Sequence, residues 1–209
     1  MVGALYLPAT YGSDRWFRRV PTSGIVALPS DAGEINDVTT AATAISNDGT
    51  VVVGNSGIHA VRWDPTYGTR RLPEVADRPA EESVRNYRAT NVSGDGTTVV
   101  GYIASQGGPT ALRWSSADVV VPFGSGIPKA MSKNGDLIVG HDSSYSSNAA
   151  RIWDASGNAR NIAELLGANS DVTGWNLQTA IAISDDGKVI IGTGVNPSAQ
   201  QEGWVVRLP

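Results

Sequence analysis

Short runs of Val and Ile, each ending in Gly, dominate the hydrophobic pattern of the chain. The clearest lie at 51–53, before Gly54, and at 189–191, before Gly192. Apolar and polar residues do not alternate within these runs, so the strands that they predict must be covered on both faces. Turn residues bound each run, and the pattern therefore predicts many short strands.

Each run follows an Asp-Gly or Asn-Gly turn, and the whole segment occurs four times. ATAISNDGTVVVG spans residues 42–54, and it returns as ATNVSGDGTTVVG at 89–101, PKAMSKNGDLIVG at 128–140 and AIAISDDGKVIIG at 180–192. Such turns between two apolar runs are a strong hairpin signal. The chain is therefore predicted to repeat one β unit.

The acidic turns of these repeats have two interpretations, a tight turn or a calcium loop. An EF-hand loop needs acidic residues alternating over twelve positions with a final Glu, and the sequence lacks this pattern. Asp and Asn side chains bond the backbone of tight turns, and Gly supplies positive φ at little cost. The turn glycines are accordingly predicted to be structural: Gly49, Gly96, Gly135 and Gly187.

A tryptophan marks the end of a later strand in each unit. HAVRW, TALRW and AARIW end in Trp63, Trp114 and Trp153, and Trp16 follows Gly3 at the separation at which Trp114 follows Gly101. The four tryptophans are predicted to be equivalent, and they stand 47, 51 and 39 residues apart. Periods of roughly 40–50 residues are typical of propeller blades.

These repeats predict an all-β fold, a small β-propeller in a single domain over residues 1–209. The repeat is about 47 residues long, and the expected units are 1–30, 41–76, 88–123, 127–163 and 178–209. The first unit lacks its first strand and the last unit lacks its fourth. Five blades are favoured, with four blades and an N-terminal hairpin as the alternative.

One segment between repeats carries a helix signal. Asn161 stands three residues before Glu164, which is the spacing of a capping box, and Gly167 closes the segment. We therefore expect one short helix near 161–166.

Composition removes several classes of function. A net charge of −4 gives no general attraction to nucleic acids or anionic lipids. With no Cys and two His, a metal site is not expected, and nothing indicates a cofactor. No segment approaches the ~20 apolar residues of a membrane span. The first residues also lack the pattern of a secretory signal peptide.

The repeated motif resembles a known family. A-x-A-I-S-x-D-G, then a Val/Ile run ending in Gly, then His59-Ala60-Val61, is similar to the bacterial extracellular repeat named after its His-Ala-Phe motif. Residues 110–112 occupy the same place in the next unit, and 174–197 resembles the closing repeat of that family and of autotransporter-like surface proteins. The resemblance implies a β-propeller type of repeat at bacterial cell surfaces and no shared reaction.

Arg and Trp stand side by side in two units, as Arg62-Trp63 and Arg113-Trp114. Adjacent strand residues point to opposite faces. One interpretation packs Trp between blades and has Arg bonding outward. The other is a repeated sugar platform, which requires exposed indole rings.

The loop after the third repeated Gly contains the residues that we expect to bind a ligand, if any do. His141, Asp142 and Tyr145 are polar or aromatic and are not dictated by the repeat. The default interpretation of this Ser-rich segment is a solvated hairpin loop.

Catalysis has weaker support. A glycoside hydrolase needs a pair of carboxylates, and spacing singles out no pair among the available acids, which are Glu34, Asp37, Glu81, Glu82, Asp142 and Asp171. We therefore expect a non-enzymatic structural or interaction module, displayed on a bacterial cell surface or a bacteriophage particle. Its expected partner is a protein in a larger assembly, and that partner could be a second copy of the chain in a homo-oligomer. A lectin-like propeller that binds surface glycans is the alternative.

Overall fold

The computed structural model describes the chain in nine segments. They are 2–5, 15–20, 24–28, 40–76, 86–105, 107–116, 119–142, 149–167 and 172–208. Strands dominate these segments, and they form five antiparallel sheets that we name A to E in chain order. The all-β prediction is therefore confirmed.

The strands follow one another without crossovers inside each sheet. Sheet A contains β1 (Val2–Leu5), β2 (Arg15–Val20) and β3 (Gly24–Ala27). Sheet B contains β4 (Thr40–Ile45), β5 (Val52–Ser56), β6 (His59–Asp64) and β7 (Gly68–Arg71). Sheet C contains β8 (Asn86–Val92), β9 (Thr98–Ala104), β10 (Thr110–Ser115) and β11 (Val120–Ser125). Sheet D contains β12 (Ile127–Met131), β13 (Ile138–His141), β14 (Ala150–Trp153) and β15 (Ala159–Asn161). Sheet E contains β16 (Asn176–Ile183), β17 (Val189–Val195) and β18 (Gln201–Arg207).

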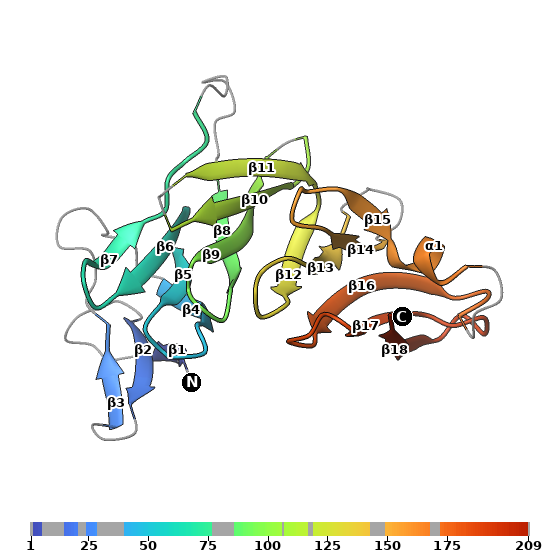
Figure 1. Cartoon of the computed structure of the whole chain (residues 1–209), viewed down its shortest axis with the longest axis horizontal. Helices are drawn as coiled ribbons and strands as arrows, with labels where there is room; N and C mark the ends of the chain where they lie inside the picture. The colour runs from blue at the N-terminus through green and yellow to red at the C-terminus, as the bar shows by residue number, and fades with distance from the viewer. Residues whose placement is uncertain are drawn as a thin grey trace.

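Each sheet packs on the next one, and together they form an arc (Figure 1). The first strands of sheets B to E lie next to each other along it, because β4 contacts β8, β8 contacts β12 and β12 contacts β16. Among the described strands, no extensive contact joins sheet A to sheet E. A closed ring of five blades therefore stays a prediction.

The single described helix, α1 (Ile162–Leu166), confirms the helix expected near 161–166. Its capping differs from the prediction. Asn161 is the N-cap but makes no side-chain capping bond, and its side-chain Nδ2 instead donates to the Glu164 carboxylate at 2.8 Å. With only five residues, this helix is too short to cross a membrane, and the described residues hold no helix that could do so.

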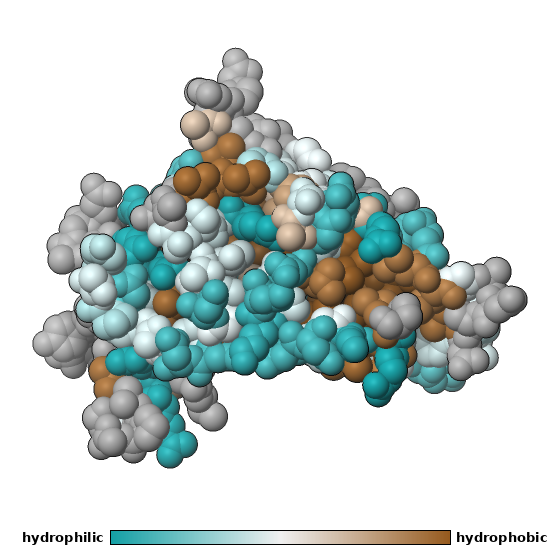
Figure 2. All heavy atoms as spheres, viewed as in Figure 1, coloured by the Kyte–Doolittle hydropathy of each residue, from teal (hydrophilic) through white to brown (hydrophobic). Residues whose placement is uncertain are grey.

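Buried side chains fill the spaces between successive sheets. Val51, Val99 and Trp114 belong to the cluster between sheets B and C. Ile152 and Trp204 belong to the cluster between sheets D and E. Figure 2 shows that hydrophobic surface also gathers at the end of the molecule that carries α1 and β16.

The tryptophans do not all occupy one position. Three of them are buried and pair with the residue two before the repeated glycine of their unit: Trp63, Trp114 and Trp153. Val206 holds this position in sheet E. Trp16 instead pairs with Ala4, the residue after Gly3. The register of β2 therefore separates Trp16 from the other three.

Each repeated turn is closed by a Ser and an Asp or Asn. In the first, the Ser46 hydroxyl donates to Asp48 at 2.7 Å and accepts from the Val51 amide at 2.9 Å, while Asp48 also accepts from the Thr50 amide at 2.9 Å. The other three turns repeat these bonds. The four turn glycines have φ values of 73° to 77°, which Gly adopts without a Cβ clash. The side-chain oxygens of these Asp and Asn residues thus hold the turn backbone.

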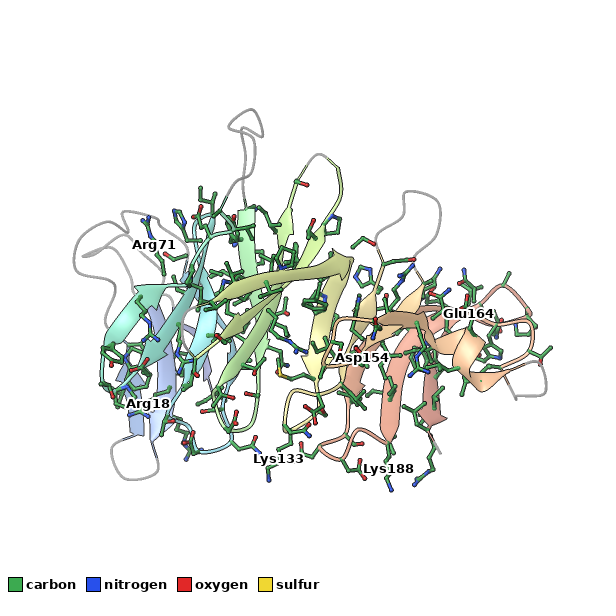
Figure 3. All side chains as sticks on the ribbon, turned by 45° about the horizontal axis from the view of Figure 1, so that its top comes forward. Arg18, Arg71, Lys133, Asp154, Glu164 and Lys188 are labelled. Atoms are coloured by element: carbon green, nitrogen blue, oxygen red, sulfur yellow. The ribbon has the colours of Figure 1, made fainter. Side chains whose placement is uncertain are left out.

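The second residue of each Ser-x-Asp/Asn-Gly turn ties one sheet to the next. The amide of Asn47 donates to the Gly94 carbonyl at 2.9 Å, the amide of Gly94 to Lys133 at 2.8 Å, and the amide of Lys133 to Asp185 at 3.1 Å. We call this series the turn ladder. Figure 3 shows Lys133 and Lys188, from the turns of sheets D and E, along the same edge of the molecule.

The glycine after each Val/Ile run allows a close approach to the first strand of its sheet. That strand has an irregular register at the same place in sheets B to E, between Ala42 and Ala44 in the first case. A Cβ on Gly54, Gly101, Gly140 or Gly192 would lie well under 3.0 Å from a backbone oxygen of that strand. The bulge and the glycine therefore depend on each other.

We predict that Gly101→Ala lowers the free energy of unfolding by roughly 1–3 kcal/mol, the usual cost of overpacking. The new methyl would overlap the Arg88 carbonyl, which backbone pairing holds in place. Urea unfolding measures the change. Gly203→Ala is the matched control, because the nearest atom to its Cβ is 3.7 Å away. Equal stability of the two variants would contradict the constraint.

We also predict that the turns make stability depend on acid pH. The bond from the Ser93 hydroxyl, followed by that from the Thr97 amide, lowers the pKa of Asp95 below its usual 3.8. Such a carboxylate stabilises the fold above that pH, and its contribution disappears as the pH falls through the lower folded pKa.

Urea unfolding from neutral pH to about pH 2 should show that Asp95→Asn has a shallower acid loss than the wild type. In the third turn Asn134 accepts the equivalent hydrogen bond from Ser132, so an Asn at position 95 should keep the acceptor oxygen at neutral pH. Asp95→Ala should lose stability across the whole range. An unchanged acid profile in Asp95→Asn would refute the assignment.

Candidate interaction surface

Sheets B, C and D each have two covered faces. We call the face toward the preceding sheet the front face and the one toward the following sheet the back face. Trp63 and Trp114 lie on front faces, within the clusters that join their sheets to the preceding ones. Val53 lies on the back face of sheet B, within the cluster shared with sheet C. This alternation follows from the strand period of two.

Arginines on the back faces bond to the next turn. Arg18 donates to the Gly49 carbonyl at 2.9 Å, Arg62 to Gly96 at 2.7 Å, and Arg113 to Gly135 at 3.4 Å. Burial lowers the pKa of Arg113, an effect that the charges of Asp136 and Asp154 oppose. Arg62 thus bonds away from its own sheet, and its side chain is buried because it crosses to sheet C.

The same back-face position holds an aliphatic residue in the last two sheets. Arg62 pairs with Val53, Arg113 with Val100, Ile152 with Val139 and Val205 with Ile191. In sheet D this exchange is compatible with burial, since Ile152 is covered by sheet E. In sheet E nothing described covers the corresponding residue.

The back face of sheet E therefore presents aliphatic side chains to solvent. Ile181 is 49% exposed, Ile191 44% and Val205 71%, and they come from β16, β17 and β18 respectively. Ile191 and Val205 are direct cross-strand partners, and Ile181 stands at the bulge of β16. We call these three residues and their surroundings the open face of sheet E.

The turn ladder ends beside the open face. Asp185 accepts the last bond of the series through its carbonyl. In the three preceding turns, the equivalent amide donates to the turn of the following sheet, whereas no described residue accepts from the Asp185 amide. The open face thus combines uncovered aliphatic side chains with an unused donor at the position where the preceding sheets bind their neighbours.

The loop residues predicted to bind a ligand are only partly described. Asp142 accepts from the Ala149 amide at 2.7 Å and pairs with Arg151 at 3.0 Å, so it closes the loop. His141 is half-buried, and its Nδ1 lies 2.7 Å from the Asp142 carbonyl. Tyr145 lies outside the described residues. These contacts bring His141 and Asp142 together through the loop backbone.

Other functional hypotheses meet different obstacles. Trp63 and Trp114 are buried, which removes the indole faces that a repeated sugar platform would use. Of the acids considered for glycoside hydrolysis, Asp142 is paired with Arg151, and the others lie outside the described residues.

The open face differs from the other back faces at a position that the strand register identifies. Once Gly192 is aligned with Gly54 and Gly101, Val205 falls where Arg62 and Arg113 stand. The exposed Val205 in place of an Arg distinguishes the last sheet. The alignment of tryptophans alone did not reveal it.

Comparison with known proteins identifies the fold. No family model matches the chain, and no curated protein matches its sequence. Solved structures do match. A TolB from Acinetobacter baumannii shares 14% identity with a TM-score of 0.61, over 99% of this chain and 50% of that one. A protein assigned as TolB from Agrobacterium tumefaciens shares 14% with a TM-score of 0.59, over 91% of this chain and 64% of that one.

An enzyme shows the same likeness. A puromycin hydrolase in complex with PGG shares 17% identity with a TM-score of 0.57, over 99% of this chain and 34% of its own. The chain thus spans between a third and two thirds of the length of these three structures. Identities this low establish the architecture alone, so the chain is an all-β protein with a β-propeller type of fold.

Proposed function

We propose that the chain is a non-enzymatic protein-interaction module that docks through the open face of sheet E. The exposure of Ile181, Ile191 and Val205 carries this proposal, because the equivalent faces of sheets B, C and D are covered by another sheet. Transfer of the apolar area of these three side chains from water into a contact is favourable. The partner that fits it is a protein that presents a sheet with an apolar face.

The proposal also includes where the protein is located. The repeats resemble the His-Ala-Phe extracellular repeat, and we propose display on a bacterial cell surface or a bacteriophage particle, where a module of this kind would join a larger assembly. A second copy of the chain is the first partner to test. Sheet E of that copy supplies the same apolar residues.

We predict that the wild type self-associates at micromolar concentrations, and that Val205→Asp abolishes association without lowering the melting temperature. A carboxylate placed in the apolar contact would have to be desolvated, whereas at this exposed position it costs the monomer little. Sedimentation velocity measures the association, and thermal unfolding measures stability.

Val119→Asp is the matched control. Val119 is 54% exposed and precedes β11, away from sheet E. The Val119→Asp variant should associate like the wild type. A wild type that remains monomeric throughout, or Val205→Asp and Val119→Asp associating equally, would remove the open face as the docking surface for a second copy.

A further inference from the structure

Two successive grooves between sheets occupy equivalent places. The first lies between sheets C and D, has a volume of about 240 Å³, and is lined in part by Arg113, Val121 and Ala155. The second lies between sheets D and E, has a volume of about 290 Å³, and is lined by Leu137, Ile152, Arg160, Leu165, Leu166 and Leu208. Arg113 pairs across strands with Val121, as Ile152 does with Arg160.

One wall of the first groove is the guanidinium of Arg113. Arg113 donates to the Ala155 carbonyl at 2.7 Å, and its guanidinium lies 5.9 Å from the centre of the Phe123 ring. In the second groove the corresponding residue is Ile152, which is buried and has no group to bond a carbonyl. The aliphatic and arginine positions are thus exchanged between the two grooves.

The exchange moves a positive charge to the mouth of the second groove. Directly paired residues of antiparallel strands point to the same side of a sheet, so Arg160 lies on the side of Ile152. Arg160 is exposed, and no described residue accepts a hydrogen bond from it. The carboxylate of nearby Asp154 accepts hydrogen bonds from Ser156 and Asn158 within its own turn, and its charge also interacts with that of Arg160.

The interior of this groove is aliphatic. Leu165 and Leu166 come from α1, and among the described units only this one carries a helix. Leu208 follows the last strand of sheet E, and its backbone amide donates a hydrogen bond to the Lys188 carbonyl at 2.7 Å. The groove therefore combines leucine walls with a single guanidinium.

We propose that this groove binds a small amphipathic carboxylate, with the apolar chain between the leucines and the carboxylate on Arg160. Arginine binds carboxylates with two parallel bonds. The groove volume is near the lower end for ligand sites. At about 30 Å³ for each water-sized group, it has room for roughly ten non-hydrogen atoms. Octanoate has that size and that chemistry.

Titration calorimetry with octanoate, 1-octanol and octylammonium tests the proposal on the intact chain. The three probes share one apolar chain and differ in the charge of the head group. Octanoate should bind at least about tenfold more tightly than octanol, since a hydrogen bond to a charged group contributes that much. Octylammonium should bind most weakly, because Arg160 repels it.

Variants separate the head group from the chain. Arg160→Gln should weaken octanoate by about tenfold and leave octanol unchanged. Arg207→Gln, an exposed arginine that does not line the groove, should change neither. Ile152→Arg restores the guanidinium of the preceding groove and should abolish both. If Ile152→Arg does not fold, Leu166→Trp fills the same space.

Three results would overturn the proposal. They are absence of octanoate binding at millimolar concentrations, equal binding of octanoate and octylammonium, and unchanged octanoate binding in a folded Ile152→Arg or Leu166→Trp variant. None of these depends on self-association. The groove and the open face can therefore fail separately.

Discussion

Backbone hydrogen bonds between successive turns fix the spacing of the sheets. The amides of Asn47, Gly94 and Lys133 each donate to the turn of the following sheet. Sheets B to E are thereby joined at one edge through the main chain alone. Side chains then fill the space between them, and each interface is a variation on one geometry.

The back-face position occupied by Arg62 in sheet B is the one that varies most between sheets. An Arg of sheets A, B and C donates a hydrogen bond to the next turn, and an aliphatic residue replaces it in sheets D and E. In sheet D this replacement leaves room beside α1, and in sheet E it leaves an uncovered face. Both proposed binding regions thus arise where a residue of the repeat changes from a bonding to an apolar type.

Much of the fold could be predicted from the sequence because its signals are local. The Asp-Gly turns and the Val/Ile runs define hairpins, and the segment before Gly167 defines a helix. Register was harder. The spacing of Trp16 from Gly3 matched the later units, but β1 and β2 pair with a different offset. The bulges beside Gly54 and its equivalents also depend on close contact between strands, which the sequence does not display.

The candidate sites were predicted less well, since exposure is a property of neighbours. The sequence singled out His141 and Asp142 as independent of the repeat, yet their contacts close a loop. Val205 looks like an ordinary strand residue until its register is known.

Because every amide of the turn ladder points toward the later unit, the two ends of the series differ in chemistry. One end offers the carbonyl of Asn47 and the other the amide of Asp185. A duplicated repeat could therefore be added at either end of the series with the same backbone hydrogen bond that joins the existing turns. Because this direction is set by backbone groups, it does not depend on which side chains the added repeat carries.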